Sequence, residues 1–404
     1  MTQKVVLICL AVILGSCSWV SAADSLEEKN LSAAFDHFEV MVRDHSGTPD
    51  AEHLDTLLAF LDKNTEPGIL WEESRKEKGT GVGVGFSVPS SLPRFIQYMY
   101  DPDIPVSAVV PGVVRLVREA KGATKGRCAR FREEDGGAQE PIVVRSRYVM
   151  EITPDSNSGA YYGYDQDELT LLSSWHGRRF LLTASRQTAP SDVGKKGYPM
   201  TTRDGGTLYC YSGKKGLTKA GLGWVDSYIY TSLAITIYLE TAPGSDALAA
   251  VSYKWINAGW MGKNMVRAHH ISHGIQRFAE HLGRFLSSPN IPDPHGLAAL
   301  ARRLKSGKVQ ALRGVLEAQL HALLKPGQKR ASMMNRRYVE ALDREELVAG
   351  ILSTHVESLM SGGDPGFLTG LLGGDERLED NALLTGRSAS EDSPVPAGDR
   401  PALN

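Results

Sequence analysis

Residues 79–88 read GTGVGVGFSV, and their strict alternation constrains the fold more than any other stretch of the chain. Successive side chains of an extended strand point to opposite faces, so the larger side chains share one face: Val82, Val84, Phe86 and Val88. The other face carries Gly81, Gly83 and Gly85, which let a neighbouring segment approach the backbone closely. The stretch lacks the G-x-G-x-x-G spacing of a nucleotide-binding loop. We therefore expect a strand with one thin face and no phosphate site.

The length and charge of the chain set broad limits. At 404 residues, the chain is long enough for two or three domains, or for one large domain with additions. The net charge is −2, so nothing in the overall charge favours a nucleic-acid partner, and we expect none.

The N-terminus resembles an export leader. Lys4 precedes the apolar run VVLICLAVILG, which is short for a bilayer span and typical of a signal peptide. The residues VSA at 20–22 fit ordinary cleavage, giving a signal peptide of residues 1–22. LGSC at 14–17 instead fits lipidation of Cys17, and an uncleaved anchor is the third alternative. All three predict an exported protein, either periplasmic or secreted, and lipidation of Cys17 would anchor it to a membrane.

Two cysteines lie beyond the leader, Cys128 and Cys210. An oxidising compartment would allow them to form a disulfide. Two separate buried thiols are the alternative, and the sequence leaves both open.

Changes in periodicity divide the mature chain. Residues 23–65 and 290–373 have helical apolar spacing, and residues 374–404 have the composition of a disordered tail. Residues 79–287 alternate mainly like strands, so we expect an α+β domain with a curved antiparallel sheet. ESRKEKG at 73–79 predicts a solvated connection, and residues 187–206 a long loop.

Individual elements have more specific signals. Residues 169–175 and 179–186 predict the two strands of a hairpin turning at His176 and Gly177. Residues 224–240 alternate for so long that we expect a bend or bulge within the strand. Asp343 and Glu346 have the spacing of a helix capping pair.

Residues 267–286, RAHHISHGIQRFAEHLGRFL, predict an amphipathic helix rich in histidine. His269 and His273 have the i, i+4 spacing that zinc sites use. At about 100° per residue, however, they lie almost opposite the apolar stripe of the helix. We consider solvated histidines, contact with another segment, and a metal site as alternatives.

The order of elements resembles the helix-grip fold of START-type lipid-binding domains. The resemblance rests on residues 79–88, on SSLPRFIQYMYDPDIPVSAVVP at 90–111, on the strand at 224–240, and on residues 252–282. It covers residues 79–287, about half of the chain. It implies a sheet wrapped around the last helix, with an apolar cavity between them.

The resemblance predicts an exported binding protein for an apolar ligand, such as a lipid, held between the sheet and the helix at 264–287. Six residues are candidate pocket-lining residues: Ile275, Phe278, Leu282, Tyr148, Tyr228 and Tyr230. Arg145 and Arg147 are candidates for holding a polar headgroup. We predict no cofactor.

Two other functions remain open. One is an envelope scaffold without a cavity, binding a protein partner through the C-terminal helices. The other is a hydrolase, although the chain has no G-x-S-x-G, H-E-x-x-H or Walker A motif and we identify no catalytic residue. For the basic residues at 195–196, 214–215 and 325–337, we consider a solvated surface and contact with a membrane surface as alternatives.

Overall fold

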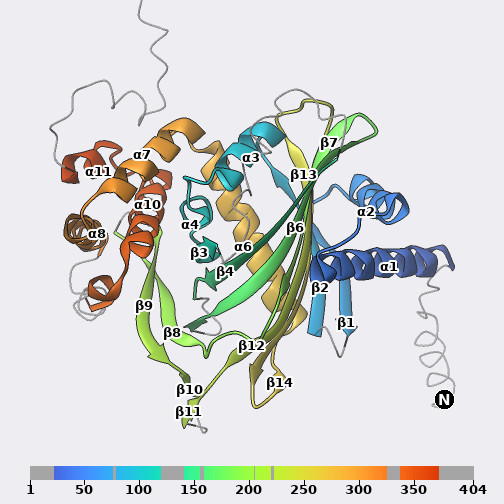
Figure 1. Cartoon of the computed structure of the whole chain (residues 1–404), viewed down its shortest axis with the longest axis horizontal. Helices are drawn as coiled ribbons and strands as arrows, with labels where there is room; N and C mark the ends of the chain where they lie inside the picture. The colour runs from blue at the N-terminus through green and yellow to red at the C-terminus, as the bar shows by residue number, and fades with distance from the viewer. Residues whose placement is uncertain are drawn as a thin grey trace, which may run out of the picture.

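The structure of the protein, a computed structural model, describes residues 22–75, 79–119, 141–154, 159–203, 205–219, 223–324 and 337–372. Over these ranges it is an α+β protein with helices on both faces of a large antiparallel sheet (Figure 1). The α+β class and the antiparallel sheet are as predicted. None of the helices in these ranges combines the length and apolar character needed to span a membrane.

Nine strands of the described residues form the large sheet. They are β1 (Gly68–Arg75), β2 (Gly79–Val88), β3 (Val114–Glu119), β4 (Ile142–Ile152), β6 (Gly163–Trp175), β7 (Arg178–Gln187), β12 (Tyr228–Glu240), β13 (Leu248–Trp260) and β14 (Lys263–Asn264). Their order is β1-β2-β13-β12-β7-β6-β4-β3, with β14 paired to β13. The early strand β2 therefore pairs with the late strand β13, and every neighbouring pair is antiparallel.

Two smaller sheets extend this framework. One contains β5 (Ala160–Tyr161), β8 (Lys195–Thr201) and β9 (Thr207–Lys215), and the other contains β10 (Leu217–Lys219) and β11 (Gly223–Val225). The prediction of an uninterrupted loop at 187–206 was therefore wrong. Gly197 and Pro199 weaken the local strand signal of β8, and pairing with β9 stabilises it.

Strand β1 was also not predicted, because its second half lies in the charged sequence that we interpreted as a connection. Residues Gly68–Arg75 pair with β2 at the edge of the large sheet. Charged residues such as Glu72 and Glu73 are common on edge strands, where they oppose pairing with another chain.

The helices form three groups (Figure 1). Helices α1 (Ala22–Asp44) and α2 (Ala51–Lys63) cover one face of the large sheet. Helices α3 (Leu92–Tyr100), α4 (Val106–Val109) and α6 (Ala268–Ser287) cover the other face. The C-terminal group is α7 (Pro294–Ser306), α8 (Val309–Leu323), α10 (Arg344–Met360) and α11 (Gly366–Leu371).

The face of the sheet beneath α1 has a dense aromatic core. Phe35 of α1 is completely buried, with its ring centroid 4.6 Å from that of Tyr253 and 5.0 Å from that of Trp255. These rings lie over the glycine face of β2: a Cβ atom on Gly83 would come within 2.7 Å of the Tyr253 ring. The predicted close approach to the glycines is confirmed.

The two predicted irregularities in the strands are also present. His176 and Gly177 connect β6 to β7 with φ angles of 49° and 77°, the left-handed values that a tight hairpin turn needs. The long alternating segment is interrupted at 226–227, between β11 and β12, and β12 shifts register against β13 after Ile229.

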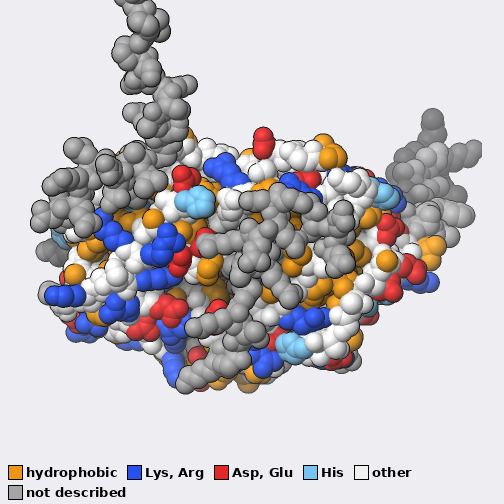
Figure 2. Space-filling model, turned by 45° about the horizontal axis from the view of Figure 1, so that its top comes forward, with side chains coloured by type: hydrophobic (Ala, Val, Ile, Leu, Met, Phe, Trp, Pro, Cys, Tyr) orange, Lys and Arg blue, Asp and Glu red, His pale blue; other side chains and the backbone are white. Residues whose placement is uncertain are grey.

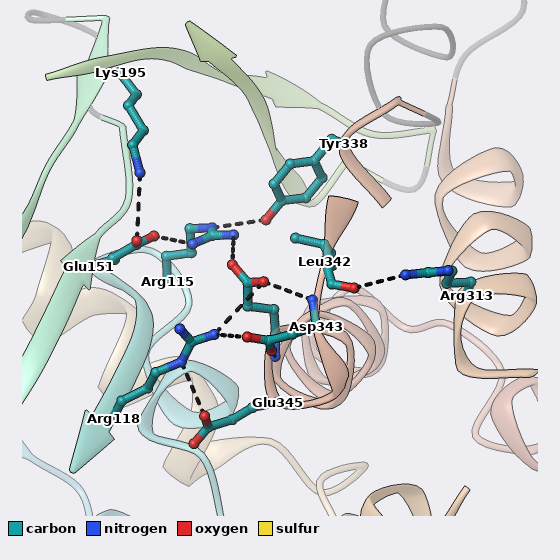
Figure 3. A network of polar contacts seen from close by, with 10 residues as sticks. Arg115, Arg118, Glu151, Lys195, Arg313, Tyr338, Leu342, Asp343 and Glu345 are labelled. Atoms are coloured by element: carbon teal, nitrogen blue, oxygen red, sulfur yellow. Dashed lines mark hydrogen bonds and ion pairs between the residues drawn. The ribbon is translucent and has the colours of Figure 1, made fainter. Parts of the chain in front are cut away.

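The C-terminal helices attach to the edge of the sheet through a polar network (Figure 3). Arg115 of β3 donates hydrogen bonds to Tyr338 Oη over 2.8 Å and to Glu346 of α10 over 2.9 Å. It also pairs with Glu151 of β4. Glu346 and Asp343 form the predicted capping pair, each accepting a 2.9 Å hydrogen bond from the backbone of the other. This network fixes the C-terminal helices to the sheet.

Charged side chains of both signs lie on either side of the face seen in Figure 2. Acidic and basic side chains are interspersed on that face, in keeping with the net charge of −2.

Candidate ligand-binding site

A cavity of about 310 Å³ lies between the large sheet and helices α3, α4 and α6. Ligand pockets in proteins usually measure about 300–1,000 Å³, so its volume suits a small molecule. The wall formed by the helices is almost entirely apolar. Its main side chains are Phe95, Met99, Val106, Val110, Ile271, Ile275 and Phe278.

The wall formed by the central strands is polar. Eight polar residues line it: Gln166, Glu168, Thr183, Ser185, Ser232, Thr236, Ser252 and Lys254. The strand register aligns them in rows, because Glu168 pairs with Ser185, and Thr183 with Thr236. A molecule in this cavity would meet apolar side chains on one side and hydrogen-bonding groups on the other.

Glu168 is the centre of one polar cluster in this wall. Its carboxylate is buried and accepts a 2.5 Å hydrogen bond from the hydroxyl of Tyr148 and a 3.3 Å hydrogen bond from Thr170. The amide of Gln166 donates to the same Tyr148 oxygen over 2.8 Å. Burial, and then the charge of Glu168, raise the pKa of Tyr238, which is therefore a neutral phenol at physiological pH.

Lys254 lies on β13, between Ala234 of β12 and Val82 of β2. Its side chain lines the cavity, and no residue in the described part of the chain forms an ion pair with it. Burial lowers its pKa, and the positive charge of Arg277 on α6 lowers it further. The cavity therefore contains a lysine with no charge partner.

Helix α6 supplies the remaining polar and small residues, His270 and Gly274. Gly274 faces the cavity, and a Cβ atom built on it would have nothing within 4 Å. The space next to this glycine is part of the cavity volume, and a larger side chain would occupy it.

The structure brings three of the predicted pocket residues together. Tyr148, Ile275 and Phe278 line the cavity. Leu282 is fully buried one turn beyond Phe278 and does not line it. Tyr228 and Tyr230 lie at the start of β12, beyond the end of the cavity, where the Tyr230 hydroxyl accepts a 2.9 Å hydrogen bond from the backbone of Gly262.

The expectation that Arg145 and Arg147 face the cavity was wrong. Alternation along β4 directs Tyr148 to the cavity and these arginines to the opposite face. Arg145 donates to the backbone oxygen of Gly47 over 2.7 Å. Arg147 donates to the carboxylate of Asp167 over 2.6 Å, next to the C-terminal end of α1.

The metal and disulfide candidates lie elsewhere. His269 and His273 are exposed, with ring centroids 6.0 Å apart. Among the described residues, no group of three or more histidine, cysteine or acidic side chains is placed to hold a metal ion. Cys210 is buried, with its sulfur 3.1 Å from that of Met200. Cys128 and Cys17 lie outside the described residues, so disulfide formation and lipidation remain predictions.

A second cavity, of about 70 Å³, lies between β3, β9 and the C-terminal helices. Tyr209 and Glu357 line it, and Glu357 Oε1 lies 2.9 Å from Nε2 of His281 on α6. Burial, followed by the negative charge of Glu357, raises the pKa of Tyr209 to about 12. A volume this small has space for only a few water molecules.

Sequence reasoning missed the polar wall of the larger cavity. Ser252, Lys254 and Thr236 alternate with the large apolar residues of β12 and β13, a pattern that is typical of a sheet with one solvated face. The available signal was the extreme apolar character of the alternate positions. Such large apolar side chains indicate that the apolar face of these strands is fully covered. The helices predicted in residues 90–111 and 267–286 can then pack only against the polar face.

Comparison of the sequence with models of known protein families, and with curated proteins, finds no match.

Proposed function

We propose that the protein is an exported binding protein that holds an apolar small molecule between the large sheet and α6. The observation that carries this proposal is the cavity of about 310 Å³, whose helical wall is apolar. Burial of apolar ligand surface against Phe95, Ile275 and Phe278 would provide the binding free energy, at about 25 cal/mol per Å² removed from water. A small number of polar contacts would then fix the ligand's orientation.

The strand order supports the helix-grip interpretation of residues 79–287. In the large sheet the first strand of that region, β2, pairs with its last long strand, β13, and two short helices follow β2. Helix α6 follows β13 and packs on β2. Membership of the START-type superfamily is part of the proposal, as is export directed by residues 1–22, which lie outside the described ranges.

The scaffold alternative draws less support from the C-terminal helices. Their apolar stripes are buried against one another, as at Leu304, Leu316 and Leu352. In the described part of residues 290–372, Phe367 is the one large apolar side chain that is well exposed. No specific observation favours a hydrolase.

Substitution of Gly274 tests the proposal directly. Gly274→Leu would place a side chain in the cavity, with free space around its Cβ atom, and leucine favours helix over glycine by roughly 0.8 kcal/mol. Gly283→Leu is the matched control, because Gly283 is on the same helix, also has free space around its Cβ position and does not line the cavity.

The measurement is native mass spectrometry of each purified protein, followed by solvent extraction of bound small molecules. We expect an apolar molecule to co-purify with the wild type and with Gly283→Leu, and to be lost from Gly274→Leu. Absence of any such molecule from the wild type, or its full retention by Gly274→Leu, would contradict the proposal.

A further inference from the structure

Lys254 is a basic residue in the cavity wall, and no acidic side chain in the described ranges forms an ion pair with it. It sits in the interior of β13, three strands away from Glu168 on β6. At about 4.8 Å per strand, the two Cα atoms are roughly 14 Å apart across the sheet. The carboxylate of Glu168 is also already bonded to Tyr148 and Thr170. Glu168 therefore does not neutralise Lys254.

An ammonium group in such a place is costly unless it acquires a partner. Transfer of an unpaired charge out of water opposes folding, and a lysine in this position responds with a lowered pKa. Arg277 on α6 adds a second positive charge, which lowers the pKa of Lys254 further. An anion in the cavity would remove this cost and restore the charge of the lysine.

The surroundings of Lys254 are suited to the oxygen atoms of such an anion. Ser252 lies two residues earlier on the same strand and shares a 2.9 Å hydrogen bond with Thr236. Ser185 occupies the same cross-strand row as Lys254, with Ala234 between them. The small side chain of Ala234 leaves room above the strands beside the ammonium group.

We propose that the ligand is an organic anion: an apolar body with a carboxylate or similar acid that pairs with Lys254. This inference rests on the proposed binding function and specifies the chemical class of its ligand. The apolar body lies against Ile275 and Phe278, and the acid lies against the polar wall near Ser252. The cavity volume of about 310 Å³ limits the body to a single short chain or a small ring system.

Two probes that differ only in the head group test this assignment: decanoate and decanol. Isothermal titration calorimetry would measure the affinity of the full mature chain for each, in the wild type, Lys254→Met and Lys254→Gln. Met preserves the length and apolar stem, and Gln preserves a polar end without charge. Lys263→Met, at an exposed lysine of β14, is the matched control.

We expect the wild type and Lys263→Met to bind decanoate more tightly than decanol. Loss of a charge-assisted hydrogen bond should weaken decanoate binding roughly ten- to a hundredfold in both Lys254 variants, with decanol binding unchanged. Equal decanoate affinity in the wild type and the Lys254 variants would overturn the anion assignment, and so would a preference of the wild type for decanol. If neither probe bound the wild type, the binding function itself would be contradicted.

Discussion

The guanidinium of Arg115, on β3, donates a hydrogen bond from Nη2 to Oε1 of Glu346, on α10, over 2.9 Å (Figure 3). The side chain of Arg115 is 9% exposed, and it also pairs with Glu151 and Tyr338. Burial lowers the pKa of Arg115, but its neighbours, Tyr338 and Glu151 first, raise it more strongly, so the group stays charged. A single buried cation therefore connects the edge of the sheet to the C-terminal helices.

Removal of this side chain should destabilise the protein strongly. Arg115→Ala takes the closest cation away from two partly buried carboxylates, Glu151 and Glu346, which keep only 3.8 Å contacts to Lys195 and Arg118. Breaking such a buried network costs about 3–5 kcal/mol. Urea unfolding followed by circular dichroism would measure the free energy of unfolding.

Arg118→Ala is the control for this variant. Arg118 pairs most closely with Asp343 and Glu345, whose side chains are 54% and 60% exposed, and lies 3.8 Å from Glu346. The loss should therefore be below about 1 kcal/mol. Equal losses in the two variants would show that the Arg115 network contributes no more than a surface ion pair.

The main elements of residues 79–287 could be predicted because their signals are local. Alternation identified the hairpin at His176 and Gly177 without knowledge of the partners. The length of the alternating segment at 224–240 predicted a bend or bulge without its position, and the structure has the interruption at 226–227. The glycine face of β2 also indicated close packing, although not that Tyr253 would supply it.

The polar wall of the cavity could not be predicted in the same way. Whether Lys254 and Thr236 face water or a covered cavity depends on which helices cover each face of the sheet, and the alternation of one strand does not identify those helices. Arg147 illustrates the converse error, since its strand phase excluded it from the cavity but its charge suggested a ligand contact. Side-chain chemistry has to be combined with strand phase before a site residue is assigned.

Two glycine-to-alanine changes, one on the glycine face of β2 and one on α8, should have opposite effects on the stability of the protein. Gly83→Ala would force a methyl group within 2.7 Å of the ring of the fully buried Tyr253, and overpacking of this kind costs about 1–3 kcal/mol. Gly314→Ala, in an exposed position of α8 with no atom within 4 Å, should stabilise the protein by about 0.5–1 kcal/mol. Thermal unfolding measured by calorimetry would show whether each substitution lowers or raises the stability of the protein. A neutral or stabilising effect of Gly83→Ala would contradict the close packing.

Because the ring of Phe35 is completely buried, we expect α1 to be an integral part of the core. Phe35→Ala removes a completely buried ring from contact with Trp71, Tyr253 and Trp255, and such truncations cost about 3–5 kcal/mol. Leu26→Ala, on the same helix at 59% exposure, should change the free energy of unfolding by less than about 0.5 kcal/mol. Chemical denaturation compares the two, and a small effect of Phe35→Ala would mean that α1 detaches readily from the sheet.

His355, buried on α10, predicts a loss of stability in acid. Burial lowers its pKa from 6.5 to about 4, so the folded state holds the neutral ring where the unfolded chain would bind a proton. Above pH 6.5 the buried neutral ring does not reduce the free energy of unfolding. As the pH falls from 6.5 towards 4, that free energy decreases by an amount on the order of 3 kcal/mol. His355→Leu removes the titrating group, so its free energy of unfolding should fall less between pH 7.5 and pH 4.5 than that of the wild type. Parallel pH profiles for the two proteins would show that His355 does not remain neutral in the folded state.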